Sequence, residues 1–192
     1  MSAKPRIAAI ALLAALALAA VVLLVRGATE DGVRIVVEKP LAFNLRYPTS
    51  MHKLAPKTGE YLHLRRKGLD EFIVEPLRLP PYKGDVGGAL PIQASREIAA
   101  LKQRFPDLDP VEEGKTRINR VAGYSLVFRA SRTPRLYGRL VLLPQAAPGA
   151  LDGVKLLLLA TPKGGADKAR DVGTRGELKT PYRSFRFGTE GP

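Results

Sequence analysis

The sequence predicts an α+β protein in which a mostly antiparallel β-sheet packs with two helices and is preceded by a single N-terminal transmembrane helix. Three observations support this fold class. Residues 7–25 form an uninterrupted apolar run. Beyond residue 40, most segments alternate apolar and polar residues at a period of two, which is typical of strands with one face toward water. Helical patterns occur at two places among many strands, and this combination indicates the α+β class.

The apolar run predicts where the protein lies. As a helix, Ile7 to Val25 would reach about 28 Å, close to the roughly 30 Å hydrocarbon thickness of a bilayer. A secretory signal peptide normally has an apolar core of about 7 to 15 residues and small residues at its cleavage site. Ala17-Leu18-Ala19 fits that rule, but cleavage there would leave Ala20 to Val25 as an apolar stub. We therefore predict an uncleaved signal-anchor, with a cleaved signal peptide or a buried core helix as the alternatives.

The charges beside the run predict its orientation. Lys4 and Arg6 precede it, whereas Arg26 after it is followed by Glu30 and Asp31. Basic flanks favour the cytoplasm, so the chain is expected to be single-pass in the cell membrane, with a cytoplasmic N-terminus and an extracytoplasmic C-terminal domain. The expected parts are a basic stub (1–6), the transmembrane helix (7–25), a linker (26–40), the α+β domain (41–188) and a tail (189–192).

The first firm strand is expected at residues 41–47, where Phe43, Leu45 and Tyr47 alternate with polar neighbours. Pro48 ends it, because proline cannot donate to the sheet ladder. Residues 33–38 are expected as an entry strand or an extended stalk. Further strands are predicted at 61–66, 72–79, 116–121, 124–130, 136–143 and 154–160. The first two of these form a hairpin around the turn 67–70, the middle pair flanks Ala122-Gly123, and the last two are apolar enough to be central strands.

Two helical regions complete the predicted domain. Ala94, Ile98, Leu101 and Phe105 recur at helical spacing within 92–105, after a loop at 84–88, and Pro106 ends the pattern. A second helical region is expected after residues 162–165, broken near Gly173 or Gly176, and leads into residues 182–187.

These features together resemble a known superfamily. The opening segment Leu41 to Pro48, the mid-chain helix, the strand entry at Val121-Ala122-Gly123-Tyr124 and the closing Ser184-Phe185-Arg186 are similar to the PsbP-like α/β/α sandwich, over about residues 40–188. Within it, the chain resembles exported bacterial members of the actinobacterial LpqN type. The resemblance implies a non-catalytic binding or scaffolding domain.

The composition of the chain excludes several kinds of anchor and catalytic site. The chain has no cysteine, which excludes a lipid-modified cysteine anchor, disulfides and thiolate catalysis. Its net charge is +13, and the part after residue 26 still carries 28 basic against 18 acidic residues. Such a field favours polyanions, while the alternative is simply a solvated basic surface. Six cations in the densest basic stretch are candidate contacts for an anionic surface: Lys163, Lys168, Arg170, Arg175, Lys179 and Arg183. Nucleic acid is not expected, because an anchored exported domain would seldom meet it and the aromatic interleaving of an RNA-binding sheet is absent.

Several short sequence segments match catalytic motifs only superficially. Ser50-Met51-His52-Lys53 and Lys57-Thr58-Gly59 match motifs of penicillin-recognising enzymes, but here both would fall in one loop after Pro48 rather than across a cleft. Gly114-Lys115-Thr116 resembles the end of a P-loop, yet the required first glycine is Asp109.

The remaining polar candidates are equally weak. His52 and His63 lack further ligands at suitable spacing for a metal. The acidic pairs Glu112-Glu113 and Asp107 with Asp109 are expected as exposed residues of one loop. No catalytic, cofactor-binding or metal-binding residue is predicted.

The predicted function is therefore a membrane-anchored, extracytoplasmic, non-catalytic binding or assembly module of the bacterial envelope. Its expected contacts are the bilayer, through Ile7 to Val25, and an envelope protein, anionic lipid or cell-wall polymer. The alternative is a carrier of a small ligand or lipid.

Overall fold

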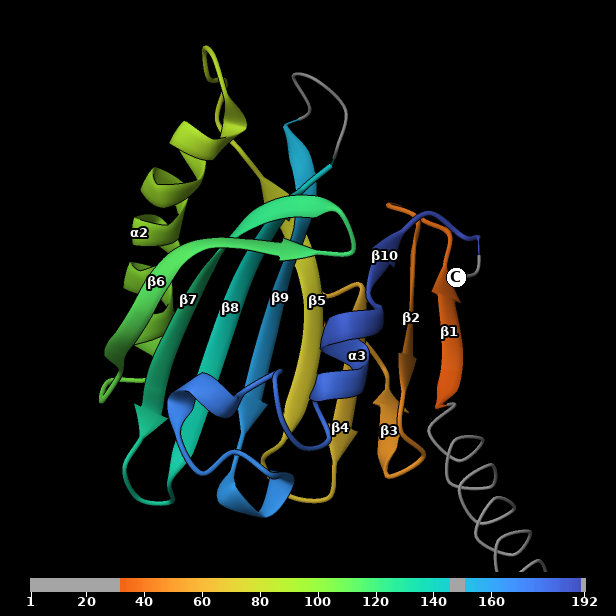
Figure 1. The fold of residues 1–192 in the computed structure, drawn as a ribbon, viewed down its shortest axis with the longest axis vertical. Helices are drawn as coiled ribbons and strands as arrows, with labels where there is room; N and C mark the ends of the chain where they lie inside the picture. The colour runs from red at the N-terminus through yellow and green to blue at the C-terminus, as the bar shows by residue number, and fades with distance from the viewer. Residues whose placement is uncertain (1–31, 146–150, 191–192) are drawn as a thin grey trace, which may run out of the picture. The chain divides into compact units, whose positions relative to one another are not determined.

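A seven-stranded antiparallel sheet forms the centre of the fold (Figure 1). The computed structural model describes residues 32–145 and 151–190, so the predicted span at 7–25 lies outside the described residues. The strand order is β3-β4-β5-β9-β8-β7-β6. These strands are β3 (Met51–Leu54), β4 (Leu62–Arg66), β5 (Glu71–Arg78), β6 (Asp109–Ile118), β7 (Val121–Ser131), β8 (Leu136–Pro144) and β9 (Asp152–Ala160). The most apolar pair, β8 and β9, is central, as predicted.

A smaller antiparallel sheet joins the two ends of the described chain. It consists of β1 (Val33–Val37), β2 (Phe43–Tyr47) and β10 (Arg186–Phe187), with β2 in the middle. β1 pairs with β2 over its whole length, from Val33 opposite Tyr47 to Val37 opposite Phe43. The sheet structure therefore begins at Val33, inside the range expected as a linker, because these alternating β-branched residues find a partner strand.

The large sheet has a filled apolar layer on each face. Along β9, Val154, Leu156 and Leu158 belong to one buried cluster, and Leu157 and Leu159 belong to the other. The long helix α2 (Val86–Arg104) covers the second face, while the small sheet, α3 (Lys179–Ser184) and the loops before it cover the first (Figure 1). This arrangement confirms a mostly antiparallel α+β domain.

The helix α2 begins earlier than apolar spacing predicts. Its first residue is Val86, within the segment 84–88 expected as a loop. The Asp85 side chain caps it by accepting a hydrogen bond from the Gly87 amide at 3.1 Å. Such a cap offsets the low helix propensity of glycine in the first turn. The predicted inner face is correct, since Ala94 and Leu101 are buried.

The two edge strands of the large sheet, β3 and β6, differ from the prediction. Residues 51–54, expected as loop, form β3, which pairs Met51 with Arg66. β6 begins at Asp109 rather than near residue 116, so Glu112 and Glu113 lie on a strand and not in a loop, although both are exposed. Edge strands tolerate charged side chains because one side has no neighbouring strand, and this obscures the alternation.

The β6–β7 turn lies at Asn119-Arg120 and not at Ala122-Gly123. Both turn residues have positive φ, 43° and 73°, a conformation that asparagine tolerates well. Gly123 lies inside β7, where an added Cβ would come within 2.4 Å of the Leu142 carbonyl oxygen. The glycine therefore permits close packing between strands.

The region after β9 is helical in short pieces. Two 3-10 turns, η1 (Pro162–Gly164) and η2 (Ala169–Asp171), precede α3. Gly173 and Gly176, the predicted break points, have φ of +75° and +63°, which ends a helix. Within the part of the chain that the structure describes, no helix is long and apolar enough to cross a membrane.

Candidate functional site

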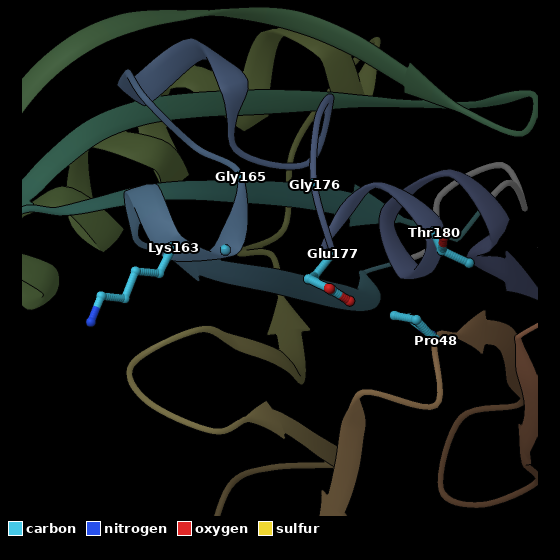
Figure 2. Close-up of a pocket in the computed structure, with 7 residues that line it drawn as sticks. Pro48, Lys163, Gly165, Gly176, Glu177 and Thr180 are labelled. Atoms are coloured by element: carbon cyan, nitrogen blue, oxygen red, sulfur yellow. The ribbon is translucent and has the colours of Figure 1, made fainter.

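A surface hollow lies where β9 leaves the sheet and two glycine-containing loops meet. Its volume is about 350 Å³. It is lined by Pro48, Lys163, Gly164, Gly165, Gly176, Glu177 and Thr180. Figure 2 shows the Glu177 side chain between the two loops and Pro48, and the Lys163 side chain extending away from it. The hollow therefore combines bare backbone with two opposite charges.

Glycine is required where the two loops touch. An added Cβ on Gly165 would lie 2.6 Å from the Gly176 Cα, and one on Gly176 would lie 2.0 Å from the Gly164 carbonyl oxygen. Gly165 and Gly176 also have φ of +94° and +63°, which other residues rarely adopt. The Glu177 amide donates a hydrogen bond to the Gly164 carbonyl at 3.2 Å and joins the loops. One wall of the hollow is thus main chain.

The carboxylate of Glu177 is held by two neighbours. The Ser50 hydroxyl donates a short hydrogen bond to Glu177 Oε2. The Arg66 guanidinium lies on the other side, with Nε 3.9 Å from Glu177 Oε1. This carboxylate therefore ties the loop after Gly176 to β4 and to the residue before β3.

A buried aspartate supports the opposite wall. Asp70, which is 1% exposed, accepts hydrogen bonds at Oδ1 from the Thr161 amide (2.6 Å) and hydroxyl (2.9 Å). Arg66 Nη1 lies 3.4 Å from Asp70 Oδ2 and donates to the Lys163 carbonyl at 2.8 Å. An added Cβ on Gly164 would approach this carboxylate to 2.5 Å. Asp70 and Arg66 thus fix the η1 turn from beneath.

Sequence reasoning missed Arg66, Asp70 and Glu177. Asp70 lies in a hairpin turn, where aspartate is common for local reasons, so its residue type gives no signal. Arg66 and Asp70 are four residues apart, but Glu177 follows more than 100 residues later and meets them only after the sheet has formed.

The geometry of the hollow suits recognition. Its lining carboxylate, Glu177, accepts a hydrogen bond from the Ser50 hydroxyl, and the buried Asp70 beneath it accepts from Thr161. Lys163 is exposed and supplies positive charge at the rim. Among the described residues, no group of three or more His, Asp or Glu side chains is placed to hold a metal ion.

The six cations predicted to contact an anionic surface lie on the segment that follows β9. All six side chains are exposed. Arg170 pairs with Glu112 at 2.7 Å, and Arg175 lies 3.6 Å from Asp171. Lys163 borders the hollow, Lys168 precedes η2, and Lys179 and Arg183 lie one turn apart on α3.

The other sequence candidates also lie apart from the hollow or serve the fold. His52 is exposed on β3. His63 is buried on β4, with Nδ1 3.1 Å from Glu60 Oε2 and Nε2 3.7 Å from Glu71 Oε1. Gly114-Lys115-Thr116 is part of the extended strand β6, so it cannot wrap a phosphate.

Two further hollows lie at the other end of the large sheet. One, of about 460 Å³, is formed around Leu41, Val121 and Phe187, with Gln145 and Arg186 among its polar residues. The other, of about 420 Å³, lies between the start of α2 and the β6–β7 hairpin.

Comparisons with known proteins identify the fold class. No family model matches the sequence, and no curated protein matches it. Among solved structures, the solution structure of cyanobacterial PsbP (CyanoP) from Synechocystis matches with a TM-score of 0.54 and 10% sequence identity. The match covers 81% of this chain and 91% of that chain. The domain therefore has a PsbP-like α+β fold, as predicted, and the resemblance to LpqN-type proteins remains a prediction.

Proposed function

We propose that this protein is a non-catalytic binding or assembly module, tethered to the cell membrane by residues 7–25 and exposed on the extracytoplasmic side. The observation that carries the proposal is the hollow beside Glu177. Its Glu177 carboxylate accepts a hydrogen bond from Ser50, while its wall of main chain is open to the hollow and Lys163 is exposed at the rim. Such a surface recognises a partner by shape and charge, and a PsbP-like fold is compatible with that role.

The tether is tested by topology. We expect the full chain to stay with membranes through alkaline carbonate extraction. Protease added outside spheroplasts should digest the domain and leave an N-terminal tag protected, because an apolar span of this length holds the chain in the bilayer. Release by carbonate, or a mature form that starts after residue 25, would instead support the cleaved-signal alternative.

Binding at the hollow is tested by position-specific photocrosslinking in the full chain. A benzophenone amino acid at Thr180 should give a discrete protein adduct, whereas the same group at Arg96, exposed on α2, should not. Lys163→Glu should reduce the adduct several-fold, and Lys102→Glu on α2 serves as the matched control. Equal adducts at both positions, or adducts with lipid alone, would contradict a partner-binding hollow.

The carrier alternative has one observation in its favour. The 460 Å³ hollow around Leu41, Val121 and Phe187 combines apolar walls with a few polar groups, as ligand pockets do. Native mass spectrometry of the full chain should detect a stoichiometric small molecule if this alternative holds. An unliganded mass together with a Thr180 adduct would favour the binding module.

A further inference from the structure

Three basic turns lie side by side at one end of the large sheet. The β4–β5 turn carries Lys67, the exit from β9 carries Lys163, and the β7–β8 turn carries Arg132 and Arg135. The register places them together: Glu71, at the start of β5, pairs with Leu159, and Tyr137, at the start of β8, pairs with Ala160. We call Lys67, Leu69, Arg132, Arg135 and Lys163 the basic end.

The basic end is free to contact a surface. Its four cations are exposed, and within residues 32–145 and 151–190 no carboxylate forms an ion pair with any of them. The outer turns are about three strand spacings, or roughly 15 Å, apart. Leu69 adds a large apolar side chain that is 40% exposed. Asp107, Asp109 and Asp167 are exposed acids in the neighbouring segments, but Asp109 is paired with Arg129 at 3.3 Å, so positive charge prevails.

The described chain enters the domain at this same end. Val33, the first residue of β1, pairs with Tyr47 at the end of β2. A turn with a hydrogen bond from the Met51 amide to the Pro48 carbonyl, 3.0 Å long, then leads into β3, where Met51 pairs with Arg66 beside the β4–β5 turn. Residues 26–32 can span at most about 25 Å. If residues 7–25 form the proposed tether, a linker of this length lets this end of the sheet reach the bilayer.

We propose that the basic end binds anionic phospholipid headgroups of the membrane that holds the tether, with Leu69 entering the interfacial layer. This inference rests on the proposed tether. Basic side chains near a membrane are attracted by anionic headgroups over about a Debye length, and an exposed leucine adds apolar contact. The contact would orient the domain relative to the bilayer.

The full chain contains no cysteine, so a single introduced cysteine can be labelled selectively. Leu69→Cys marks the basic end, and Leu151→Cys, exposed at the start of β9, is the matched control at the opposite end. Each labelled chain is reconstituted in liposomes of phosphatidylcholine alone or with 30% phosphatidylglycerol. Quenching by a headgroup-linked quencher then reports proximity to the bilayer.

We expect quenching at position 69 to rise several-fold with phosphatidylglycerol at low salt and to return to the neutral-lipid level in 0.5 M NaCl, with little change at position 151. Neutralising Lys67, Arg132, Arg135 and Lys163 to glutamine should remove the rise, while neutralising Arg96 and Lys102 on α2 should not. Unchanged thermal melting would verify that the variants are folded.

Equal quenching in both lipid mixtures, or a rise that survives the quadruple variant, would overturn the proposal. Carbonate washing of the same liposomes reports the tether separately. A chain that washes off would refute the proposed tether, yet a salt-sensitive rise at position 69 would still support headgroup binding. If a soluble anionic cell-wall polymer abolished the rise in quenching because the chain bound the polymer in preference to the lipid, headgroups would be overturned as the occupant.

Discussion

At the scale of single residues, a few buried contacts hold the loops that form the hollow. Asp70 accepts two hydrogen bonds from Thr161 and lies beside Arg66, which itself reaches Glu177. Because Asp70 is buried, it depends on these partners to satisfy its polar atoms, whereas Arg66 and Glu177 remain partly exposed. Removing one partner therefore affects the entire wall.

Asp70→Ala should lower the free energy of unfolding by about 2–3 kcal/mol, because the Thr161 amide would lose its acceptor in a buried site. Asp70→Asn keeps an acceptor oxygen of the same size and should cost clearly less. Chemical denaturation of both variants measures the difference. Equal losses would indicate that the negative charge, and not hydrogen bonding, is what matters at this position.

Gly176→Ala should cost about 3 kcal/mol or more, since it adds a contact with the Gly164 carbonyl to the penalty of positive φ. Gly59→Ala is the matched control, because Gly59 also has positive φ, +87°, but nothing lies within 4 Å of an added Cβ. It should cost about 1 kcal/mol. Similar losses in the two variants would argue against tight loop contact at the hollow.

At the scale of elements, an ion cluster joins α2 to the sheet. Lys155 on β9 lies 3.1 Å from both Glu75 on β5 and Glu97 on α2. Gln93, one turn earlier in the helix, donates to Glu97 at 2.9 Å. Burial alone would lower the pKa of Lys155, but attraction by Glu75 and Glu97 outweighs it, so the pKa is raised above its usual 10.5.

Lys155→Met should destabilise the fold by about 1–3 kcal/mol, because it leaves two partly buried carboxylates without their shared cation. Arg78→Met is the matched control: Arg78 pairs with Asp152 across the same two strands, but both side chains are largely exposed, so the loss should stay within about 0.5 kcal/mol. Urea unfolding at neutral pH measures both.

The same cluster predicts a pH dependence. Since the folded pKa of Lys155 is raised, its contribution is complete below pH 10.5 and is lost as the pH rises through the folded pKa. The stability difference between wild type and Lys155→Met should therefore shrink above pH 10.5. A difference that stays constant up to pH 12 would contradict a charged interaction as its source.

At the scale of the whole molecule, the described domain has its own apolar layers and its own sheets. Residues from Val33 onward form one compact unit, which already contains the pairing of β1 with β2 and of β2 with β10. A domain whose chain ends are both paired in a sheet folds independently of the segment before it.

We therefore expect the chain 32–192 to fold without the segment 1–31 and to unfold in one cooperative transition with the midpoint of the full chain. Calorimetry of both forms tests this. A chain starting at residue 41 is the informative control, since it lacks β1 and exposes an edge of β2. It should melt at a lower temperature, and an unchanged midpoint would show that β1 contributes nothing.

Parts of this fold could be predicted because they depend on local periodicity. The central strands β8 and β9 and the inner face of α2 follow from residue spacing, since a buried strand or helix must match its apolar pattern to a layer. The edge strands β3 and β6 and the first turn of α2 could not be predicted in this way, because charged residues obscure the alternation of an edge strand and a side-chain cap leaves no periodic signal.

The sequence by itself determined the class of the domain and the prediction of a membrane tether at residues 7–25, because both follow from apolar residues counted along the chain. Only the tertiary structure decided which charges act together. Lys67, Arg132 and Lys163 are far apart in the chain but lie in neighbouring turns at one end of the large sheet. Strand register brings distant turns together, and no local pattern encodes that proximity.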